Sequence, residues 1–164
     1  MMKKIGLMSD THSYLHPQVF KYFEQVDEIW HAGDIGNVTL ADELEAFRPF
    51  RAVYGNIDGA DIRIRYPEQL FFEAEGVPVC MIHIGGYPGK YAPGVKELLL
   101  QKAPKLFICG HSHILKVMPD PKLQLLHINP GACGQQGWHK VKTLVRFELR
   151  AGNIQNLEVI ELKK

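Results

Sequence analysis

The chain has 164 residues, 46% hydrophobic and 23% charged, which is typical of one globular domain spanning residues 1–164 and excludes a disordered or fibrous chain. Its formal net charge of +1 excludes binding to nucleic acid or to an anionic membrane by charge alone. No apolar stretch approaches the roughly 20 residues that span a bilayer, and no signal-like apolar segment follows the N-terminal lysines, so no membrane association or secretion is expected.

The first third of the sequence alternates short strand patterns with amphipathic helix patterns. Strands are expected at 3–8, 27–32 and 50–54, and helices at 16–26 and 38–47. This order of elements predicts parallel strands joined by right-handed crossovers. The carboxyl ends of such strands meet at one edge of a sheet, which is where ligands bind in open α/β folds.

The rest of the sequence is richer in strands. It predicts a hairpin over 69–84 that turns at Glu75-Gly76, a helix over 93–103 and a strand over 105–110. Four more strands with turn signals between them are expected at 114–118, 123–129, 141–150 and 153–162. We therefore predict mostly antiparallel pairing in this half, and a two-layer β core with helices outside; the strand order stays open.

Polar side chains follow five of the predicted strands. They are Asp10 and His12 in SDTH, Asp34 in GDIGN, Asn56 in GNID, His83 in IHIGG, and His111 and His113 in GHSH. Carboxylate and imidazole ligands together favour manganese, iron, zinc or cobalt over an all-oxygen calcium site. We expect the Asp-x-His and His-x-His pairs to lie on extended backbone, with both side chains on one side. The glycines beside them would let the backbone turn sharply where each strand ends.

Each motif alone also fits an ordinary turn, helix cap or loop histidine. Among the neighbouring residues, Asp58 is expected to hold a loop, and His31 and His127 to lie near the site without binding a metal. His16 and His139 are expected at the surface. Lys90 in the glycine-rich GGYPGKY segment is a candidate to reach a phosphate, although a flexible turn is the simpler interpretation.

Taken in order, D-x-H, G-D, G-N-x-D, H and G-H-x-H, followed by HINPGA, resemble the calcineurin-like metallophosphoesterase superfamily. The size and the GNID form resemble its small single-domain branch, the YfcE, archaeal phosphodiesterase and Vps29 type. The resemblance covers nearly the whole chain. It implies a four-layer α/β/β/α sandwich of mixed sheets, with two divalent metal ions at one rim; manganese is expected, with nickel, iron, zinc or cobalt as alternatives.

The resemblance also implies a role for each matching position. The first metal would take Asp10, His12 and His113, the second Asn56, His83 and His111, and Asp34 would bridge them. A hydroxide bridging the two ions would attack phosphorus, so that no separate protein nucleophile is needed. The implied substrate is a small phosphoester, with a phosphodiester expected.

Two positions depart from the family pattern. Ile57 stands where many larger members have a histidine proposed to protonate the leaving group, so the general acid is unassigned. Ile84 stands where the family has the glycine of H-G-H. The alternative to an enzyme is a Vps29-like interaction scaffold with a vestigial site, but retention of all seven ligand positions favours an enzyme. The neutral charge and the absence of a basic stripe disfavour a nuclease.

The cellular compartment is predicted from the cysteines. Cys80, Cys109 and Cys133 are odd in number and form no C-x-x-C pair, so a disulfide framework is not expected. Cys80 and Cys109 sit in apolar runs typical of buried residues. A reducing cytoplasm is therefore the expected compartment. Nothing in the sequence indicates the oligomeric state.

Overall fold

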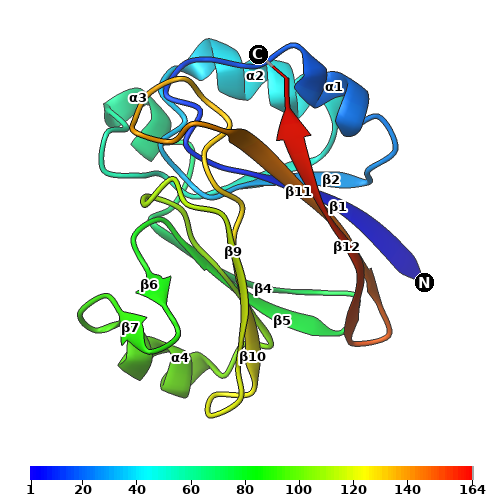
Figure 1. Ribbon diagram of the computed structural model, residues 1–164, viewed down its shortest axis with the longest axis vertical. Coiled ribbons are helices and arrows are strands. Elements are labelled where there is room, and N and C mark those ends of the chain that lie inside the picture. Colours follow the sequence, from blue (N-terminus) through cyan, green and yellow to red (C-terminus); the bar gives the residue numbers. More distant parts are fainter. Residues whose placement is uncertain (164) are drawn as a thin grey trace.

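The computed structural model describes residues 1–163 and consists of four layers (Figure 1). Two five-stranded sheets stack on one another, with α1 and α2 covering the outer face of one sheet and α4 that of the other. Three hydrophobic clusters fill the spaces between these layers, and the middle one lies between the two sheets. The expected α/β/β/α sandwich of mixed sheets is thus confirmed.

The first sheet contains the βαβαβ unit predicted from the N-terminal third. Its strands, in spatial order, are β12 (Asn153–Leu162), β11 (Lys142–Arg150), β1 (Met2–Met8), β2 (Glu28–His31) and β3 (Phe50–Ala52). The three N-terminal strands are parallel to one another, whereas β11 pairs antiparallel with β1 and β12. The crossover helices are α1 (Gln18–Tyr22) and α2 (Val38–Phe47), and Asn37 caps α2 by accepting a hydrogen bond from the backbone N–H of Leu40.

The second sheet corrects part of the prediction for the C-terminal half. Its strands, in spatial order, are β4 (Gln69–Ala74), β5 (Val77–Ile82), β8 (Leu106–Ile108), β10 (Leu125–Asn129) and β9 (Lys116–Asp120). The two edge strands pair antiparallel as expected, but the three central strands are parallel. β5 and β8 are parallel because α4 (Val95–Lys102) crosses between them and returns the chain in the same direction, and β10 is parallel to β8 because the chain first runs back through β9.

Short elements escaped the sequence patterns. These are α3 (Ala60–Arg63), β6 (Gly86–Tyr87) and β7 (Lys90–Tyr91), none of which is long enough to show a period. The first helix is also shorter than predicted, because the chain turns after Tyr22 and still buries Phe23 and Val26. His16 is buried rather than at the surface, with its Nε2 donating to the carbonyl of Lys163.

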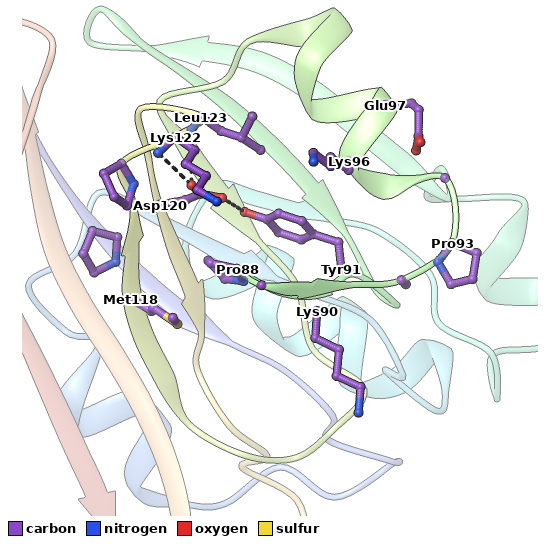
Figure 2. Close-up of a pocket in the computed structure, with 15 residues that line it drawn as sticks. Pro88, Lys90, Tyr91, Pro93, Lys96, Glu97, Met118, Asp120, Lys122 and Leu123 are labelled. Carbon is purple, nitrogen blue, oxygen red and sulfur yellow. Dashed lines mark hydrogen bonds between the residues drawn. The ribbon is translucent and has the colours of Figure 1, made fainter.

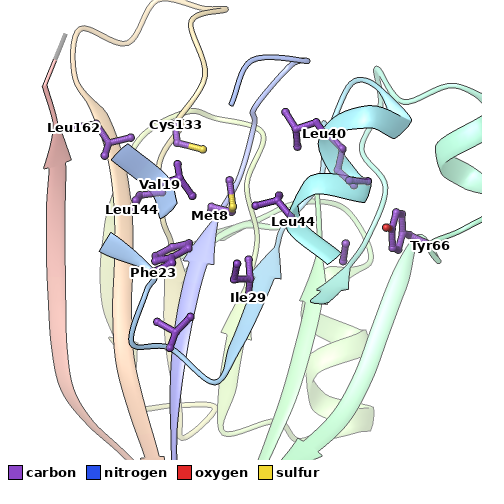
Figure 3. Close-up of a cluster of buried hydrophobic side chains, with 14 of the residues drawn as sticks. Met8, Val19, Phe23, Ile29, Leu40, Leu44, Tyr66, Cys133, Leu144 and Leu162 are labelled. Carbon is purple, nitrogen blue, oxygen red and sulfur yellow. The ribbon is translucent and has the colours of Figure 1, made fainter. Parts of the chain in front are cut away.

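The helices are held against the first sheet by a cluster of interdigitating side chains (Figure 3). Val19 and Phe23 descend from α1 and the segment after it, and Leu44 from α2, onto Met8 and Ile29 of the sheet. All five are fully buried. Burying such side chains stabilises the fold by about 1.5–3 kcal/mol each.

Glu28, at the start of β2, is a buried carboxylate with three donors. It accepts hydrogen bonds from Lys3 Nζ at 2.6 Å, Trp30 Nε1 at 3.0 Å and Arg51 Nε at 3.0 Å. Burial raises the pKa of Glu28, but these donors outweigh burial and leave the pKa below its ordinary value. Glu28 therefore stabilises the fold only while it is ionised.

Replacing Glu28 with Gln should lower the free energy of unfolding at pH 7 by about 1–3 kcal/mol, because the donors lose a charged acceptor. Since the folded pKa is the lower one, the wild-type advantage should be complete above the unfolded pKa of Glu and disappear as pH falls through the folded value. Urea unfolding of both proteins between pH 7 and pH 3 measures this. A difference that stays constant over that range would contradict it.

The three cysteines are free and buried, as expected for two of them. Burial raises the pKa of each thiol to about 12, so none is a reactive thiolate near neutral pH. Within residues 1–163, every helix is too short or too polar to cross a bilayer.

Candidate metal centre

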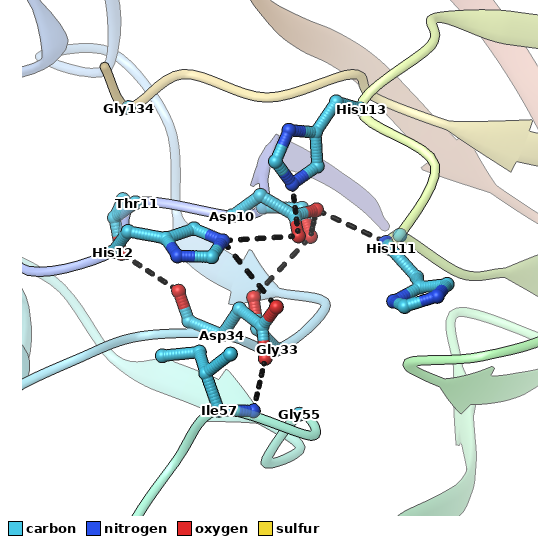
Figure 4. Close-up of polar contacts among 12 residues, drawn as sticks. Asp10, Thr11, His12, Gly33, Asp34, Gly55, Ile57, His111, His113 and Gly134 are labelled. Carbon is cyan, nitrogen blue, oxygen red and sulfur yellow. Dashed lines mark hydrogen bonds and ion pairs between the residues drawn. The ribbon is translucent and has the colours of Figure 1, made fainter. Parts of the chain in front are cut away.

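The polar residues predicted at the strand ends gather at one rim of the sandwich (Figure 4). They follow β1, β2 and β3 of the first sheet and β5 and β8 of the second. The strands β1, β2 and β3 are parallel to one another, and so are β5 and β8, so each set of carboxyl ends lies on one edge of its sheet. The stacking of the sheets brings the two edges together. Hydrogen bonds join the sheets here, among them those from His83 Nδ1 to the carbonyl of Ala32 and from the backbone N–H of His111 to Asp10 Oδ2.

The backbone of these loops is not extended, contrary to expectation. Positive φ angles occur at Asp10 (55°), His12 (46°), Asp34 (57°), His111 (72°) and His113 (66°). A non-glycine residue in this region is strained by about 1–3 kcal/mol and persists only where its surroundings enforce it. Hydrogen bonds between the loops enforce it, among them Asp10 N to Gly33 O and His12 N to Asp34 O, both 3.0 Å. Such strain is typical of functional sites.

Two glycines allow the carboxylates to approach neighbouring backbone. A Cβ at Gly55 would lie 2.1 Å from Asp34 Oδ1, and a Cβ at Gly110 would lie 2.7 Å from Asp10 Oδ2. Both distances are impossible for real side chains, so a side chain at either position would displace a carboxylate. At Gly55 and Gly110, glycine is therefore needed because there is no room for a side chain, and not because the backbone turns sharply, as was expected.

The first cluster contains Asp10, His12 and His113, and one ligand atom of each lies within 4.8 Å of the others. Asp10 Oδ1 is 3.2 Å from His113 Nε2 and 3.8 Å from His12 Nε2. The other oxygen, Oδ2, accepts hydrogen bonds from Ser9 Oγ at 2.7 Å and from the N–H of His111 at 3.1 Å. These bonds fix the carboxylate and leave Oδ1 directed at the imidazoles (Figure 4).

The second cluster contains Asp34, His83 and His111, again with ligand atoms within 4.8 Å of one another. Asp34 Oδ2 is 3.1 Å from His83 Nε2 and 3.3 Å from His12 Nε2, so this carboxylate contacts both clusters. The hydrogen bond from His83 Nδ1 to Ala32 leaves the lone pair of Nε2 facing Asp34 when the ring is neutral. Asn56 lies beside this cluster, with its Oδ1 3.1 Å from His111 Nδ1.

The electrostatics of the two clusters fit a bound cation. Burial raises the pKa of both Asp10 and Asp34, but neighbouring histidines outweigh burial and lower both values. Contact with Asp10 raises the pKa of His12. Burial lowers the pKa of His83, but the neighbouring carboxylates outweigh burial and raise it. Asp10 Oδ1, His12 Nε2 and His83 Nε2 are buried and make no hydrogen bond; their close polar contacts are ion pairs with ligand atoms of the two clusters. Converging acceptor atoms of this kind fit a divalent cation with mixed oxygen and nitrogen ligands.

Asp58 and His31 support the loops, as predicted. The Asp58 carboxylate accepts hydrogen bonds from the backbone N–H groups of Ile35 at 3.1 Å, Gly36 at 2.8 Å and Gly55 at 2.8 Å, which ties the second and third ligand loops together. His31 lies behind the clusters. Burial lowers the pKa of His31 to about 4, so it stays neutral and accepts from the N–H of Gly33 at 3.1 Å.

His127 lies on β10, and His139 lies in the segment between β10 and β11. His127 is buried on β10, where its Nδ1 donates to the carbonyl of Phe107 at 3.1 Å. His139 was expected at the surface but is only partly exposed, with its ring edge-on to His113 at 5.1 Å between centroids. Its Nε2 donates to the carbonyl of Gly134 at 2.8 Å. Its sequence context of glycine and polar residues carries no signal of this position.

A large cavity lies away from the clusters, between the β6–β7 hairpin, α4 and the β9–β10 turn (Figure 2). Its volume is about 720 Å³, and its lining includes Tyr91, whose hydroxyl donates to Asp120 Oδ2 at 2.6 Å. Lys90, the candidate phosphate contact, also lines this cavity. None of the predicted ligands lines it, so cavity size alone does not locate the chemistry.

Comparison with known proteins agrees with the site. The sequence profile of the calcineurin-like phosphoesterase superfamily domain matches residues 2–152. The chain belongs to this superfamily. A probable metallophosphoesterase of Methanothermobacter thermautotrophicus is 33% identical over 135 residues, covering 78% of this chain and 76% of the relative. A second one, from Methanocaldococcus jannaschii, is 31% identical over 135 residues, covering 78% and 67%.

Solved structures of this superfamily share the fold. A predicted phosphoesterase of Streptococcus pneumoniae superposes with a TM-score of 0.72 at 20% identity, covering 98% of this chain and 90% of the other. Vps29 of Chaetomium thermophilum superposes with a TM-score of 0.77 at 13% identity, covering 98% and 97%. At such low identity these likenesses establish the calcineurin-like fold, and the function has to be argued from the site.

Proposed function

We propose that this metallophosphoesterase is a two-metal enzyme that hydrolyses phosphodiesters. Asp10, His12 and His113 would hold one ion, Asn56, His83 and His111 the other, and Asp34 would bridge them. The observation that carries the proposal is the position of Asp34 Oδ2, 3.1 Å from His83 Nε2 and 3.3 Å from His12 Nε2, where one carboxylate contacts both ligand clusters. Two divalent ions held there would bind the phosphoryl group, lower the pKa of a water that attacks it, and neutralise developing charge.

The protein's own groups then orient rather than react. Ser9 and the N–H of His111 hold Asp10, and the N–H of Ile57 holds Asp34 through Oδ1 at 3.0 Å. The Ile57 side chain has no proton to donate to a leaving group. We therefore expect the enzyme to prefer esters of acidic alcohols, such as aryl esters, which leave without protonation.

Metal dependence tests this function. Protein stripped with a chelator should be inactive toward bis(4-nitrophenyl) phosphate, and Mn²⁺ should restore turnover. Elemental analysis of the reconstituted protein should find about two transition ions per chain, because two clusters each offer three ligands. Nickel, iron, zinc and cobalt belong in the same series, since the ligands do not select strongly among these ions. No turnover with any of them would overturn the proposal.

A second candidate is the Vps29-like interaction scaffold that the sequence resemblance left open; the chain shares its fold with Vps29 structures. It predicts purified protein with little bound metal and no turnover under any reconstitution. The buried ligand atoms argue against it, because Asp10 Oδ1, His12 Nε2 and His83 Nε2 converge on one another and make no hydrogen bond to other groups. For the phosphodiesterase, we also propose a cytoplasmic location and a preference for manganese.

A further inference from the structure

We propose that a hollow beside His111 binds the ester group that stays on phosphorus, and that this group is flat and aromatic. The inference rests on the proposed phosphodiesterase activity and names the class of its substrate. The hollow has a volume of about 330 Å³, and its lining includes Ile84, Tyr87, Pro93, His111, Ile114 and Lys116. We call it the Ile84 hollow.

The first argument is exposure of large apolar side chains at the rim of a polar site. Ile84 is 47% exposed, Ile114 63% and Tyr87 37%. Ile84 directly follows His83, and Ile114 directly follows His113, so both are carried by the ligand loops themselves. An exposed apolar patch around a polar centre is typical of a surface that a ligand covers.

The second argument is position. His111 belongs to the second cluster and also lines the Ile84 hollow, so the hollow opens directly beside the ligands. In an in-line displacement the attacking and leaving oxygens lie opposite each other on phosphorus. A water that attacks from the ligand side pushes the leaving group outward, and the remaining ester group lies to the side, where this hollow is. A volume of about 330 Å³ is at the lower end for small-ligand pockets and leaves room for one aromatic ring.

The third argument is the contrast with a hollow of about 560 Å³ on the other side of Ile84. That hollow also borders two of the proposed ligands, Asn56 and His83, but its lining includes Arg63 and Glu68, whose polar groups are already engaged. Arg63 donates to the carbonyls of Asp58 and Asn56, and Glu68 accepts from Tyr54. In the Ile84 hollow, by contrast, apolar faces are uncovered, and the ammonium of Lys116 lies 3.7 Å from the Tyr87 ring centroid, where it also attracts the phosphate anion.

A matched pair of substrates tests this. Phenyl 4-nitrophenyl phosphate and methyl 4-nitrophenyl phosphate release the same chromophore and differ only in the group that stays on phosphorus. With manganese-loaded protein, kcat/KM should be at least about tenfold higher for the phenyl ester, because hydrophobic pockets discriminate ligands on this scale. The double variant I84A/I114A should reduce this ratio about tenfold or abolish it. Ile64→Ala is the control, since Ile64 is 84% exposed and does not line the hollow.

Binding provides a second readout. Phenylphosphonate added to the loaded protein should shift the methyl NMR signals of Ile84 and Ile114 through its ring current, and leave Ile64, which directly follows α3, unshifted. Equal kcat/KM for both esters, or an unchanged ratio in I84A/I114A, would overturn the assignment of the hollow while leaving the phosphodiesterase intact. Failure to turn over either ester would instead overturn the proposed function.

Discussion

Replacing Asp34 with Asn should lower kcat/KM toward an aryl phosphodiester by about 10³-fold or more, a loss of roughly 4 kcal/mol of transition-state stabilisation. The reason is that one Asp34 oxygen contacts both clusters, at 3.1 Å from His83 and 3.3 Å from His12. An amide has no charge and only one acceptor oxygen, so it cannot bridge two cations while accepting the N–H of Ile57. Steady-state kinetics with saturating Mn²⁺ measure the effect.

Metal content separates this loss from simple misfolding. The Asp34→Asn protein should keep its circular dichroism spectrum and bind fewer ions than the roughly two per chain expected of the wild type. Asp61→Asn is the matched control, because Asp61 is an exposed carboxylate on α3 that is outside both clusters. An Asp34→Asn enzyme with full activity and full metal content would contradict the bridging role.

Replacing Trp30 with Ala should destabilise the fold by about 4 kcal/mol and lower the melting temperature by about 10 °C. Trp30 is fully buried between the sheets, with ring centroids 5.0 Å from Phe72 of the second sheet and 5.7 Å from Phe147 of the first. Its Nε1 also donates to Glu28. The truncation leaves a cavity at the centre of the sandwich, which rigid β layers cannot close. Urea unfolding followed by far-UV circular dichroism measures the change.

The chain provides its own control in its other tryptophan. Trp138 is fully exposed, and Trp138→Ala should change the free energy of unfolding by no more than about 0.5 kcal/mol. Trp30→Phe should lie between the two, because it keeps most of the ring volume and loses the hydrogen bond to Glu28. A Trp30→Ala protein as stable as Trp138→Ala would show that the two sheets do not depend on this contact.

The elements of the fold that could be predicted are those with a local period. Leu40 and Leu44 mark α2 by their helical spacing, and the structure places that helix at Val38–Phe47, as expected. The parallel centre of the second sheet could not be predicted, because β5, β8 and β10 are distant in sequence and their direction depends on how α4 crosses. Short elements such as α3 were missed because tertiary contacts, rather than propensity, form them.

The candidate site, like the fold, could be predicted only in part from the sequence. All seven ligand candidates were named from their motifs, but the left-handed backbone at Asp10, His12 and His113 was not expected. That conformation depends on hydrogen bonds to other loops, such as the one that the Asp10 N–H donates to the carbonyl of Gly33, which no local pattern records. The place of His139 beside His113 was missed for the same reason.

The sequence by itself determined the chemistry of the donor atoms, because residue type and order along the chain are local properties. It specified carboxylates, imidazoles and an amide at the ends of five strands, in the order of the calcineurin-like superfamily. The resemblance also implied that these donors form two groups with Asp34 between them; the tertiary structure supplied the distances, and only it decided that Ile84 borders an uncovered hollow. These are distances between loops far apart in the chain, and they arise from the stacking of two sheets through their common apolar core.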